Sequence, residues 1–390
     1  MSDDPRQALL RRAEEQRVAF VNLQFTDILG MVKNVTIPIH ELPDALDHGV
    51  WFDGSSIEGF ARIVESDMYL VPDLSTYALV PWDQHEGLAT ARLICNIYTP
   101  DGKPFAGDPR HVLAAVTRQA GEMGFAFNVA PEIEFFLFKT DAEGRTLPLP
   151  HDHAGYFDVS TDLATLIRRQ MVRALQSLDI TVEAAHHEVA AGQHEIDLRY
   201  AEALRAADQQ IVFRETVRAC AAQHGLLASF APKIYADKAG NGAHLHLSLA
   251  REGASIVTEA GQPRVLSAPM RAFMAGILEH LPALMALTTP STNSFKRIRP
   301  RFWSGAFTCW GMGNREAALR VPMPDSGLPV TNVELKTCDA TANPYLALGA
   351  VIAAGLDGID RQLPLGDAVR GDPADLSEAE RLERRILPLP

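Results

Sequence analysis

The segment Ala126-Phe-Asn-Val-Ala-Pro-Glu-Ile-Glu-Phe-Phe-Leu-Phe138 decides the fold, because its length and its apolar, β-branched and aromatic content predict one long strand. Side chains two residues apart on a strand share a face, so Glu132 and Glu134 would project side by side from an otherwise apolar strand. Two carboxylates this close repel each other unless a cation lies between them. The alternative is a solvent-facing strand edge, because a Glu-X-Glu pattern often arises by chance.

The rest of the chain predicts an α+β fold in two domains. A charged helix at the start is followed by strand-like pieces over residues 19–37, 69–80 and 91–98. The turn-rich segment Thr99-Pro-Asp-Gly-Lys-Pro104 marks a boundary, so we expect a small domain over residues 1–103 and a larger one over 104–390. In the larger domain we expect helices over 108–123, 163–178, 201–224, 269–287 and 343–361, and strands over 126–138, 183–200 and 243–249.

Composition and charge exclude several classes of partner. The 390 residues are 47% hydrophobic and 22% charged, which is ordinary for a globular protein. The net charge of −13 argues against nucleic acid or an anionic membrane as a partner, because both would be repelled. The four cysteines are far apart, which predicts neither a zinc ribbon nor disulfides and favours a reducing cytoplasm. The longest apolar run, residues 345–356, is too short to span a bilayer.

Two further segments carry metal-ligand chemistry. In Gly242-Ala-His-Leu-His-Leu-Ser248, alternation places both histidines on one face beside the serine, with hydrogen-bonded core histidines as the alternative. The segment Glu183-Ala-Ala-His-His-Glu-Val-Ala-Ala-Gly-Gln-His-Glu195 holds three glutamates and three histidines in a strand–turn–strand pattern. Hard oxygen ligands in this number favour Mg²⁺ or Mn²⁺ over zinc. We expect His151-Asp-His153, in a proline-flanked loop, to lie at the surface.

Basic residues gather late in the chain. They lie in Ser294-Phe-Lys-Arg-Ile-Arg-Pro-Arg301 and in Asn314-Arg-Glu-Ala-Ala-Leu-Arg320. Guanidinium groups bind phosphate and carboxylate bidentately, although surface ion pairs are the preferred interpretation for Arg299 and Arg301. The sequence contains no Walker A loop, kinase-type glycine loop or G-x-G-x-x-G. Local chemistry alone therefore predicts a metal-dependent enzyme that acts on anionic substrates.

Several long motifs occur in the order typical of the glutamine synthetase family, and the chain resembles the type I branch over nearly its whole length. The motifs are Asn22-Leu-Gln-Phe-Thr-Asp-Ile-Leu-Gly, Phe52-Asp-Gly-Ser-Ser-Ile-Glu-Gly-Phe, Pro131-Glu-Ile-Glu-Phe-Phe-Leu-Phe, His186-His-Glu-Val-Ala-Ala-Gly-Gln, Asn241-Gly-Ala-His-Leu-His, Asn293-Ser-Phe-Lys-Arg, Asn314-Arg and Asn343-Pro-Tyr. The resemblance implies a small β-grasp-like N-terminal domain and a catalytic domain with a curved antiparallel sheet lined by helices. It also implies a ring homo-oligomer, with a dodecamer among the sizes allowed, and active sites between subunits.

The resemblance implies a role for each matching residue. One divalent ion, Mg²⁺ or Mn²⁺, would be held by Glu134, Glu188 and Glu195, and a second by Glu132, His244 and Glu334. ATP as co-substrate would meet Glu183, His246, Ser248 and Arg320, whereas glutamate would meet Asn241, Gly242 and Arg297. Two residues would be catalytic: Arg315 would neutralise the transferring phosphoryl group, and Asp53 would reach into a neighbouring subunit's site. The implied chemistry transfers the γ-phosphate of ATP to a carboxylate, and an amine then attacks the acyl phosphate.

The sequence departs from the family at three positions that the resemblance places in the active site, most notably where the nitrogen nucleophile would bind. Trp303 stands where ammonia-using members carry a glutamate that closes the site and helps to deprotonate ammonium. An aromatic ring cannot accept that proton, but it can pack against an alkyl amine. Lys336 replaces a substrate-binding arginine and loses its bidentate fork, and Asn332 replaces a nucleotide-contacting arginine.

These departures favour a γ-glutamyl ligase that acts on an organic amine. Glutamine synthetase proper, with ammonia as nucleophile, is the first alternative. A non-catalytic protein that keeps the family fold is the second. The resemblance also implies that the chain, ending at Leu387-Pro-Leu-Pro390, stops short of the family's final helices, so a truncated C-terminus is an open interpretation.

Overall fold

The N-terminal part of the protein is built on a mixed sheet. The computed structural model describes residues 4–57, 59, 67–85, 87–150, 152, 154–159, 161–324 and 327–390. The strand order is β2-β1-β6-β4-β3, with β5 pairing β6, and β1 and β6 run parallel while the other pairs are antiparallel. The strands are β1 (Val18–Thr26), β2 (Val32–Pro38), β3 (Val50–Asp53), β4 (Asp67–Pro72), β5 (Ala78–His85) and β6 (Leu88–Tyr98). The helices are α1 (Pro5–Glu15) and α2 (Leu42–His48), with the 3-10 turns η1 (Ile39–Glu41), η2 (Gly54–Ser56) and η3 (Leu74–Thr76).

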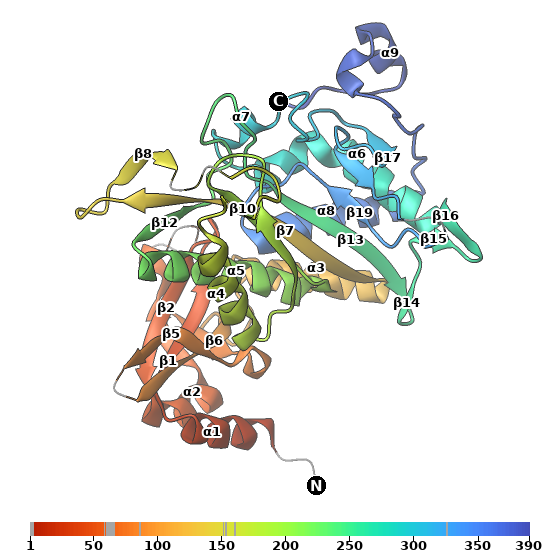
Figure 1. Cartoon of the computed structure of the whole chain (residues 1–390). Helices are drawn as coiled ribbons and strands as arrows, with labels where there is room; N and C mark the ends of the chain where they lie inside the picture. The colour runs from red at the N-terminus through yellow and green to blue at the C-terminus, as the bar shows by residue number, and fades with distance from the viewer. Residues whose placement is uncertain are drawn as a thin grey trace.

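The larger part is a long curved sheet with helices packed along it, above the N-terminal part in Figure 1. Its main strand order is β17-β18-β19-β13-β7-β10-β9, with β8, β11 and β12 pairing β7 and β14 pairing β13. The strands are β7 (Ala126–Thr140), β8 (Thr146–Pro150), β9 (Val182–His187), β10 (Gln193–Leu198), β11 (Ala201–Glu202), β12 (Leu226–Ser229), β13 (Ala243–Arg251), β14 (Ala254–Ser255), β17 (Trp310–Met312), β18 (Leu319–Val321) and β19 (Val333–Leu335). A separate hairpin joins β15 (Thr258–Glu259) to β16 (Gln262–Leu266). The helices are α3 (Pro109–Glu122), α4 (Thr165–Ser177), α5 (Ala203–Gln223), α6 (Ala268–Thr288), α7 (Ser294–Arg297), α8 (Pro344–Asp360) and α9 (Glu378–Glu383), with the 3-10 turn η4 (Pro373–Asp375).

Strand alternation separates the core face of the large sheet from its polar face. On β7 the odd-numbered residues, such as Ile133 and Phe135, pack with α4 and α5 in the core, while Glu132 and Glu134 share the other face. On β13 the odd-numbered Leu245 packs with α6 and α8. The even-numbered histidines of β13 therefore lie on the same polar face as the two glutamates.

The predicted α+β class is confirmed, and each of the five long helices expected after residue 103 forms within a few residues of its expected ends. The expected strand over residues 69–80 is wrong in part, because it is divided between β4 and β5 by η3. The division occurs where the side chain of Asp73 accepts a hydrogen bond from the backbone N–H of Ser75 and so favours a turn over a strand.

Helix α6 is long and apolar enough to cross a membrane by length and composition alone. Its buried face, which includes Phe273, Ile277 and Leu281, packs into the main core of the larger part. Close contact with α8 requires glycine on both helices, because a Cβ at Gly276 would lie 2.2 Å from the carbonyl oxygen of Ala354. The apolar character of α6 is therefore explained by its packing in the protein core.

Buried side chains tie the turn between β1 and β2 to the larger part. Asn343 caps α8 by accepting hydrogen bonds from the N–H groups of Tyr345 and Leu346, and its amide donates to the carbonyl of Asp27 at 2.9 Å. Arg214 donates to the carbonyl of Gly30 at 3.0 Å and also to carbonyls just before α8. These contacts fix the orientation of the N-terminal sheet relative to the helix layer.

We expect Asn343→Ala to lower the free energy of unfolding by about 2–4 kcal/mol, because it removes a helix cap and leaves a buried carbonyl without its donor. Asn343→Ser keeps the cap but cannot reach Asp27, so it should cost about half as much. Urea unfolding of the variants side by side gives the two values. Equal stability of the alanine variant and the unmodified protein would show that this link contributes nothing.

Candidate active site

The polar face of the large sheet carries functional side chains in cross-strand rows. In one row, His186 of β9 lies opposite Glu195 of β10, which lies opposite Glu134 of β7. In the next row, Glu132 of β7 lies between Asp197 of β10 and His244 of β13. A third row places Glu334 of β19 between His246 and Arg320. Residues far apart in the sequence therefore meet because strand register aligns them.

In one half of the polar face, the negative charges of Glu132 and Glu334 are compensated by basic side chains. Nε2 of His246 lies 2.8 Å from Glu132, and Nδ1 of His244 lies 3.5 Å from Glu132 and 3.4 Å from Glu334. Lys336 and Arg320 contact the two oxygens of Glu334 at 2.7 and 2.8 Å. Burial alone would raise both carboxyl pKa values, but hydrogen bonds from the two histidines hold the pKa of Glu132 far below its usual range. Similarly, Lys336 lowers the pKa of Glu334 to about 2 against the effect of burial.

The other half is an uncompensated cluster of Glu134, Glu188, Glu195 and Asp197, in the sense that none of the four forms an ion pair with a lysine or arginine among the described residues, and His186 is the basic side chain that contacts it. Burial raises the pKa of Glu134 and Glu188, and neighbouring carboxylates raise both further. Burial and the surrounding carboxylates raise the pKa of Glu195 to about 11, and burial with the nearby Glu132 raises that of Asp197 to about 6. All four shifts have the same physical cause, because the carboxyl groups are buried close to one another in a region with few positive charges, where ionisation is disfavoured.

The uncompensated cluster fits a divalent cation. Its donors are hard carboxylate oxygens, and Oδ1 of Asp197 is buried without a hydrogen-bond partner among the described residues. Oxygen and nitrogen atoms of His186, Glu188 and Glu195 lie within 4.8 Å of one another, as do those of Glu132, His246 and Glu334. Two ligand groups therefore lie side by side on the polar face.

The loop before β13 holds Glu134 in place. One oxygen of Glu134 accepts hydrogen bonds from the backbone N–H of Gly242 at 3.0 Å and from the amide of Gln193 at 3.1 Å. That same amide also donates to the side-chain oxygen of the buried Asn241 at 3.1 Å. A Cβ at Gly242 would lie 2.5 Å from Nε2 of His244, so a side chain at this position would displace the His244 ring.

The basic residues predicted to bind anions divide into two groups. Arg297 and Lys336 are buried, and Arg297 donates to the carbonyls of Lys336 and Cys338 at 3.0 and 2.9 Å. Arg315 is exposed. Burial is the main cause of the raised pKa of Glu188, and the positive charge of the nearby Arg315 opposes that rise. The surface interpretation of Arg301 is confirmed, because its exposed side chain pairs with Asp372 and Asp375.

The loop that carries Trp303 is clamped by a carboxylate. Arg301 and Trp303 both have positive φ, at 66° and 53°, which is unfavourable for residues with a side chain. Their backbone N–H groups each donate to one oxygen of Glu316 at 3.0 Å. The Trp303 ring is 49% exposed, so the clamped backbone presents it to solvent.

We expect Glu316→Ala to release this loop, because two charge-assisted hydrogen bonds hold its strained backbone. Amide hydrogen exchange over residues 299–305 should become at least about tenfold faster. Glu316→Gln, which keeps one acceptor oxygen, should give an intermediate rate. Unchanged exchange in the alanine variant would mean that the loop is held by other contacts.

Three residues predicted to belong to the active site, Asp53, Glu183 and Ser248, make none of the contacts described above among the carboxylates and histidines of the polar face. Asp53 ends β3 at the edge of the N-terminal sheet, where its carboxylate accepts a hydrogen bond from the N–H of Ser55. Glu183 is exposed beside the bulge between β9 and β10 and pairs with Arg199 at 3.9 Å. Ser248 lies on the polar face of β13, two residues beyond His246.

The surface interpretation of residues 151–153 is wrong for Asp152, which is fully buried against His187, whereas His151 and His153 lie outside the described residues. Gln193, Asp197 and Glu316 also contribute to the site and were not predicted from the sequence. Asp197 had a usable signal, because it follows Glu195 by two residues on a strand and must share its face. The contacts of Gln193 and Glu316 depend on how distant loops fold against them, which no local sequence pattern indicates.

Comparisons with known proteins match the chain over almost its whole length. The protein-family model described as glutamine synthetase, beta-grasp domain, matches residues 17–100. The family model described as glutamine synthetase, catalytic domain, matches residues 106–390. A glutamine synthetase of Halobacterium salinarum is 46% identical over 380 residues, covering 97% of this chain and 83% of that protein. A glutamine synthetase of Clostridium saccharobutylicum is 43% identical over 391 residues, covering 100% and 88%.

Solved structures give the same picture. A complex of GmaS with ADP superposes with a TM-score of 0.85 at 29% identity, covering 98% of this chain and 87% of that one. The cryo-EM structure of Plasmodium falciparum glutamine synthetase superposes with a TM-score of 0.86 at 26% identity, covering 96% and 79%. The similarity includes both the small N-terminal sheet and the larger sheet that bears the carboxylates.

Proposed function

The chain belongs to the glutamine synthetase family and is an ATP-dependent ligase, and from this premise we propose that it joins glutamate to an organic amine through γ-glutamyl phosphate. The observation that carries the choice of amine is Trp303, an exposed ring on a clamped loop. A carboxylate at this position would help to remove a proton from ammonium, and an indole ring cannot.

The proposed ligand sets follow the two halves of the polar face. Glu134, Glu188 and Glu195 would hold one divalent ion, Mg²⁺ or Mn²⁺, and Glu132, His244 and Glu334 the second. Support for the first set is the uncompensated charge that raises these carboxyl pKa values. In the second set, His246 lies nearer to Glu132 than His244 does, whereas only His244 also lies within 3.5 Å of Glu334. The ions would offset negative charge on the phosphates and on the attacking carboxylate.

The remaining residues are proposed to position the substrates. Arg297, Lys336, Asn241 and Gly242 would bind glutamate, Trp303 would bind the amine, and Glu183, His246, Ser248 and Arg320 would bind ATP. A γ-carboxylate oxygen of glutamate attacks the γ-phosphorus of ATP, and the bond to ADP breaks. Arg315 offsets the charge on the phosphoryl group during this transfer. The amine nitrogen then attacks the acyl carbon, inorganic phosphate leaves, and Asp53 of a neighbouring copy takes the proton that the nitrogen loses.

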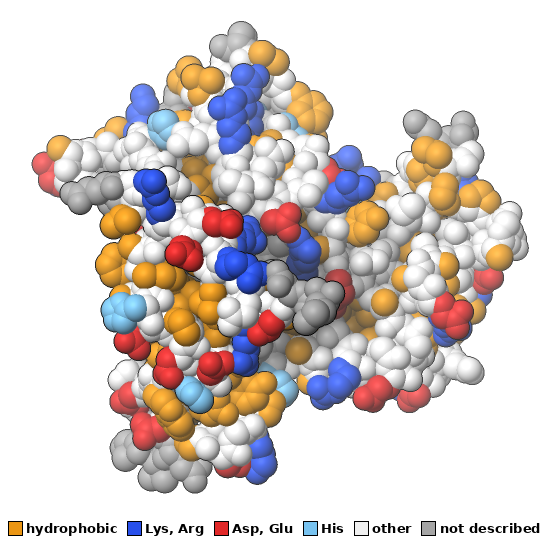
Figure 2. All heavy atoms as spheres, turned by 90° about the horizontal axis from the view of Figure 1, so that it is seen from below, with side chains coloured by type: hydrophobic (Ala, Val, Ile, Leu, Met, Phe, Trp, Pro, Cys, Tyr) orange, Lys and Arg blue, Asp and Glu red, His pale blue; other side chains and the backbone are white. Residues whose placement is uncertain are grey.

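A ring homo-oligomer is part of the proposal, because Asp53 lies in the N-terminal sheet rather than on the polar face of the large one. Large hydrophobic side chains of the N-terminal part, including Leu29, Met31 and Trp51, are more than one-third exposed, which suits burial against another subunit. Figure 2, which views the molecule from below, shows hydrophobic side chains gathered in groups among charged ones. We also propose the division into residues 1–103 and 104–390 and a cytoplasmic location, where four buried thiols would stay reduced.

The same fold with ammonia as nucleophile is the second candidate, and it is favoured by the relatives at 40–46% identity that are named glutamine synthetase. Initial rates of ATP turnover with Mg²⁺ and glutamate separate the two. Under our proposal, an amine such as methylamine, ethanolamine or putrescine supports a kcat/KM at least about tenfold higher than ammonium does. Each methylene that packs on Trp303 is worth up to about 0.8 kcal/mol, or about fourfold in kcat/KM. Robust turnover with ammonium and no preference for amines would favour the second candidate.

A further inference from the structure

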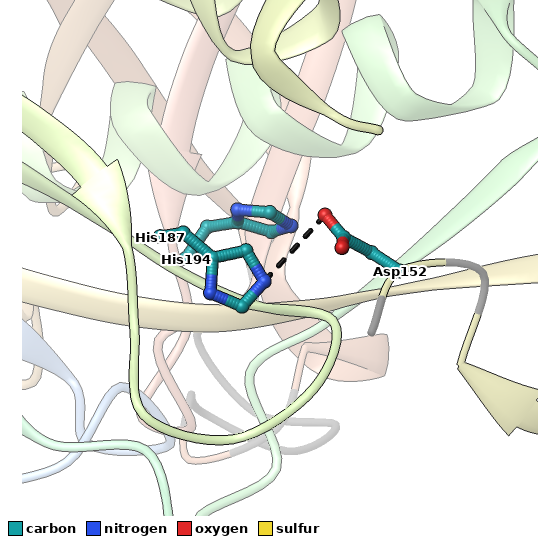
Figure 3. A group of neighbouring side chains, drawn as sticks. All are labelled: Asp152, His187 and His194. Carbon is teal, nitrogen blue, oxygen red and sulfur yellow. Dashed lines mark ion pairs between the residues drawn. The ribbon is translucent and has the colours of Figure 1, made fainter. Parts of the chain in front are cut away.

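Strands β9 and β10 carry a second polar group on the face opposite the carboxylates. His187 lies across from His194 in the strand register, and each is one residue from a side chain of the polar face, His186 or Glu195. Alternation therefore directs His187 and His194 toward the core. Both are buried there with Asp152, which comes from the loop after β8 (Figure 3).

Asp152 faces the imidazole that holds the backbone at Glu188. Oδ2 of Asp152 lies 3.5 Å from Nε2 of His187, the ion pair dashed in Figure 3. Nδ1 of His187 donates to the carbonyl of Glu188 at 2.6 Å, and the other oxygen of Asp152 accepts from the N–H of Ala154 at 2.8 Å. Oδ2 of Asp152 and Nε2 of His187 are buried and have no hydrogen-bond partner among the described residues, and the ion pair is the contact that joins them. The loop is thereby connected to the residue proposed to ligate the ion.

A second set of contacts reaches His194 from α4. Arg168 donates to Nδ1 of His194 at 3.0 Å and pairs with Asp162 at 2.5 Å, and all three side chains are buried. Asp162 in turn accepts a hydrogen bond from the N–H of Ala164 just before the helix. His194 is therefore held on the core face immediately beside Glu195.

The grouping of Asp152, His187 and His194 has the composition of a metal site, with ligand atoms within 4.8 Å of one another. Its hydrogen bonds argue against that role. A guanidinium group can only donate, so Nδ1 of His194 must accept from Arg168 and the ring proton of the neutral imidazole must be on Nε2. A protonated nitrogen cannot bind a metal ion. Two ligand atoms would remain, which is fewer than a protein metal site uses.

The loop that supplies Asp152 also contacts the polar face. The ring centroids of Tyr156 and Phe157 lie 5.5 and 4.9 Å from that of His186, in edge-to-face arrangements. Nε2 of His186 lies 3.1 Å from Glu195, and its Nδ1 lies 3.7 Å from Glu188. Asp152 on one side of the sheet and Tyr156 and Phe157 on the other therefore contact β9.

We propose that Asp152 and the Asp162–Arg168 pair are positioning residues that fix the spacing of the Glu188 and Glu195 carboxylates. The proposal rests on the proposed function, because it takes these two glutamates as metal ligands. Asp152 sets the backbone at Glu188 through His187, and Arg168 sets β10 at Glu195 through His194. Hydrogen-bond partners behind metal ligands typically change metal affinity 10- to 100-fold when they are replaced.

The test is Mn²⁺ binding to the full chain, followed by the electron paramagnetic resonance signal of free Mn²⁺ in the absence of ATP. Asp152→Asn removes the charge that faces His187, and we expect Mn²⁺ to bind at least about tenfold more weakly. Asp162→Asn removes the support of Arg168 and should act in the same direction, and it decides the matter if Asp152→Asn does not fold. Asp158→Asn is the matched control in the same loop, because Asp158 is exposed and accepts only local hydrogen bonds, and binding should stay within about twofold.

Three results would overturn the proposal. The first is that both variants melt at lower temperature yet bind Mn²⁺ within twofold of the unmodified protein, because the contacts would then be merely structural. The second is a tightly held transition-metal ion that elemental analysis finds in the unmodified protein and not in Asp152→Asn. The third is that Glu188→Gln leaves Mn²⁺ binding unchanged, which would remove the proposed metal site itself. If Glu188→Gln abolishes binding while both aspartate variants keep it, only the positioning role fails.

Discussion

Glu195→Gln is expected to abolish turnover, with a loss of at least about 10³-fold in kcat, because a neutral amide cannot supply the charge that a divalent cation needs at this position. Glu195 lies between His186 and Glu134 in a cross-strand row, so the substitution changes the charge of the ligand set while keeping its shape. ATP-dependent phosphate release in saturating Mg²⁺ measures the loss. Turnover within tenfold of the unmodified protein would exclude Glu195 as a ligand.

The same substitution should stabilise the metal-free protein. Burial and four neighbouring carboxylates raise the pKa of Glu195 to about 11, so its ionised form is disfavoured in the folded state. A glutamine removes that cost, and we expect the melting temperature in EDTA to rise by at least about 2 °C. Mn²⁺ should raise the melting temperature of the unmodified protein but not that of the variant, because only the former binds the ion tightly. A variant that is less stable in EDTA would contradict the view that this cluster lacks compensating charge.

Trp303→Glu is expected to change the nucleophile. The kcat/KM for ammonium should rise at least about tenfold, because the new carboxylate can accept a proton in the transition state. The kcat/KM for the preferred amine should fall by a similar factor, because the apolar surface that the alkyl chain contacts is lost. Trp303→Phe is the matched control, since it keeps an aromatic ring without adding a base, and it should retain the preference for amines. Unchanged selectivity in Trp303→Glu would show that another residue chooses the nucleophile.

Much of the site could be predicted from the sequence because a strand has a period of two. This rule alone put Glu132 and Glu134 on one face and paired His244 with His246, and the structure confirms both placements. The rows across the sheet could not be predicted in this way. They depend on strand register, which is set by turns and bulges such as the one beside Glu183.

The sequence also gave no sign of how charge is divided across the polar face. The four glutamates Glu132, Glu134, Glu195 and Glu334 look equivalent in the sequence, yet His244, His246 and Lys336 form ion pairs only with Glu132 and Glu334. Asp152 was misjudged for a related reason. A proline-flanked loop usually lies at the surface, but here the aspartate is buried, where it faces the His187 imidazole and accepts a hydrogen bond from the N–H of Ala154. Tertiary contacts of this kind are absent from any local pattern.

The most direct test of the central claim is the identity of the product. The enzyme is incubated with ATP, Mg²⁺, glutamate and equimolar ammonium, methylamine, ethanolamine and putrescine, and the γ-glutamyl products are quantified by mass spectrometry. We expect the γ-glutamyl amide of one organic amine to exceed glutamine by at least about tenfold. Glutamine as the main product would contradict it and identify ammonia as the nucleophile.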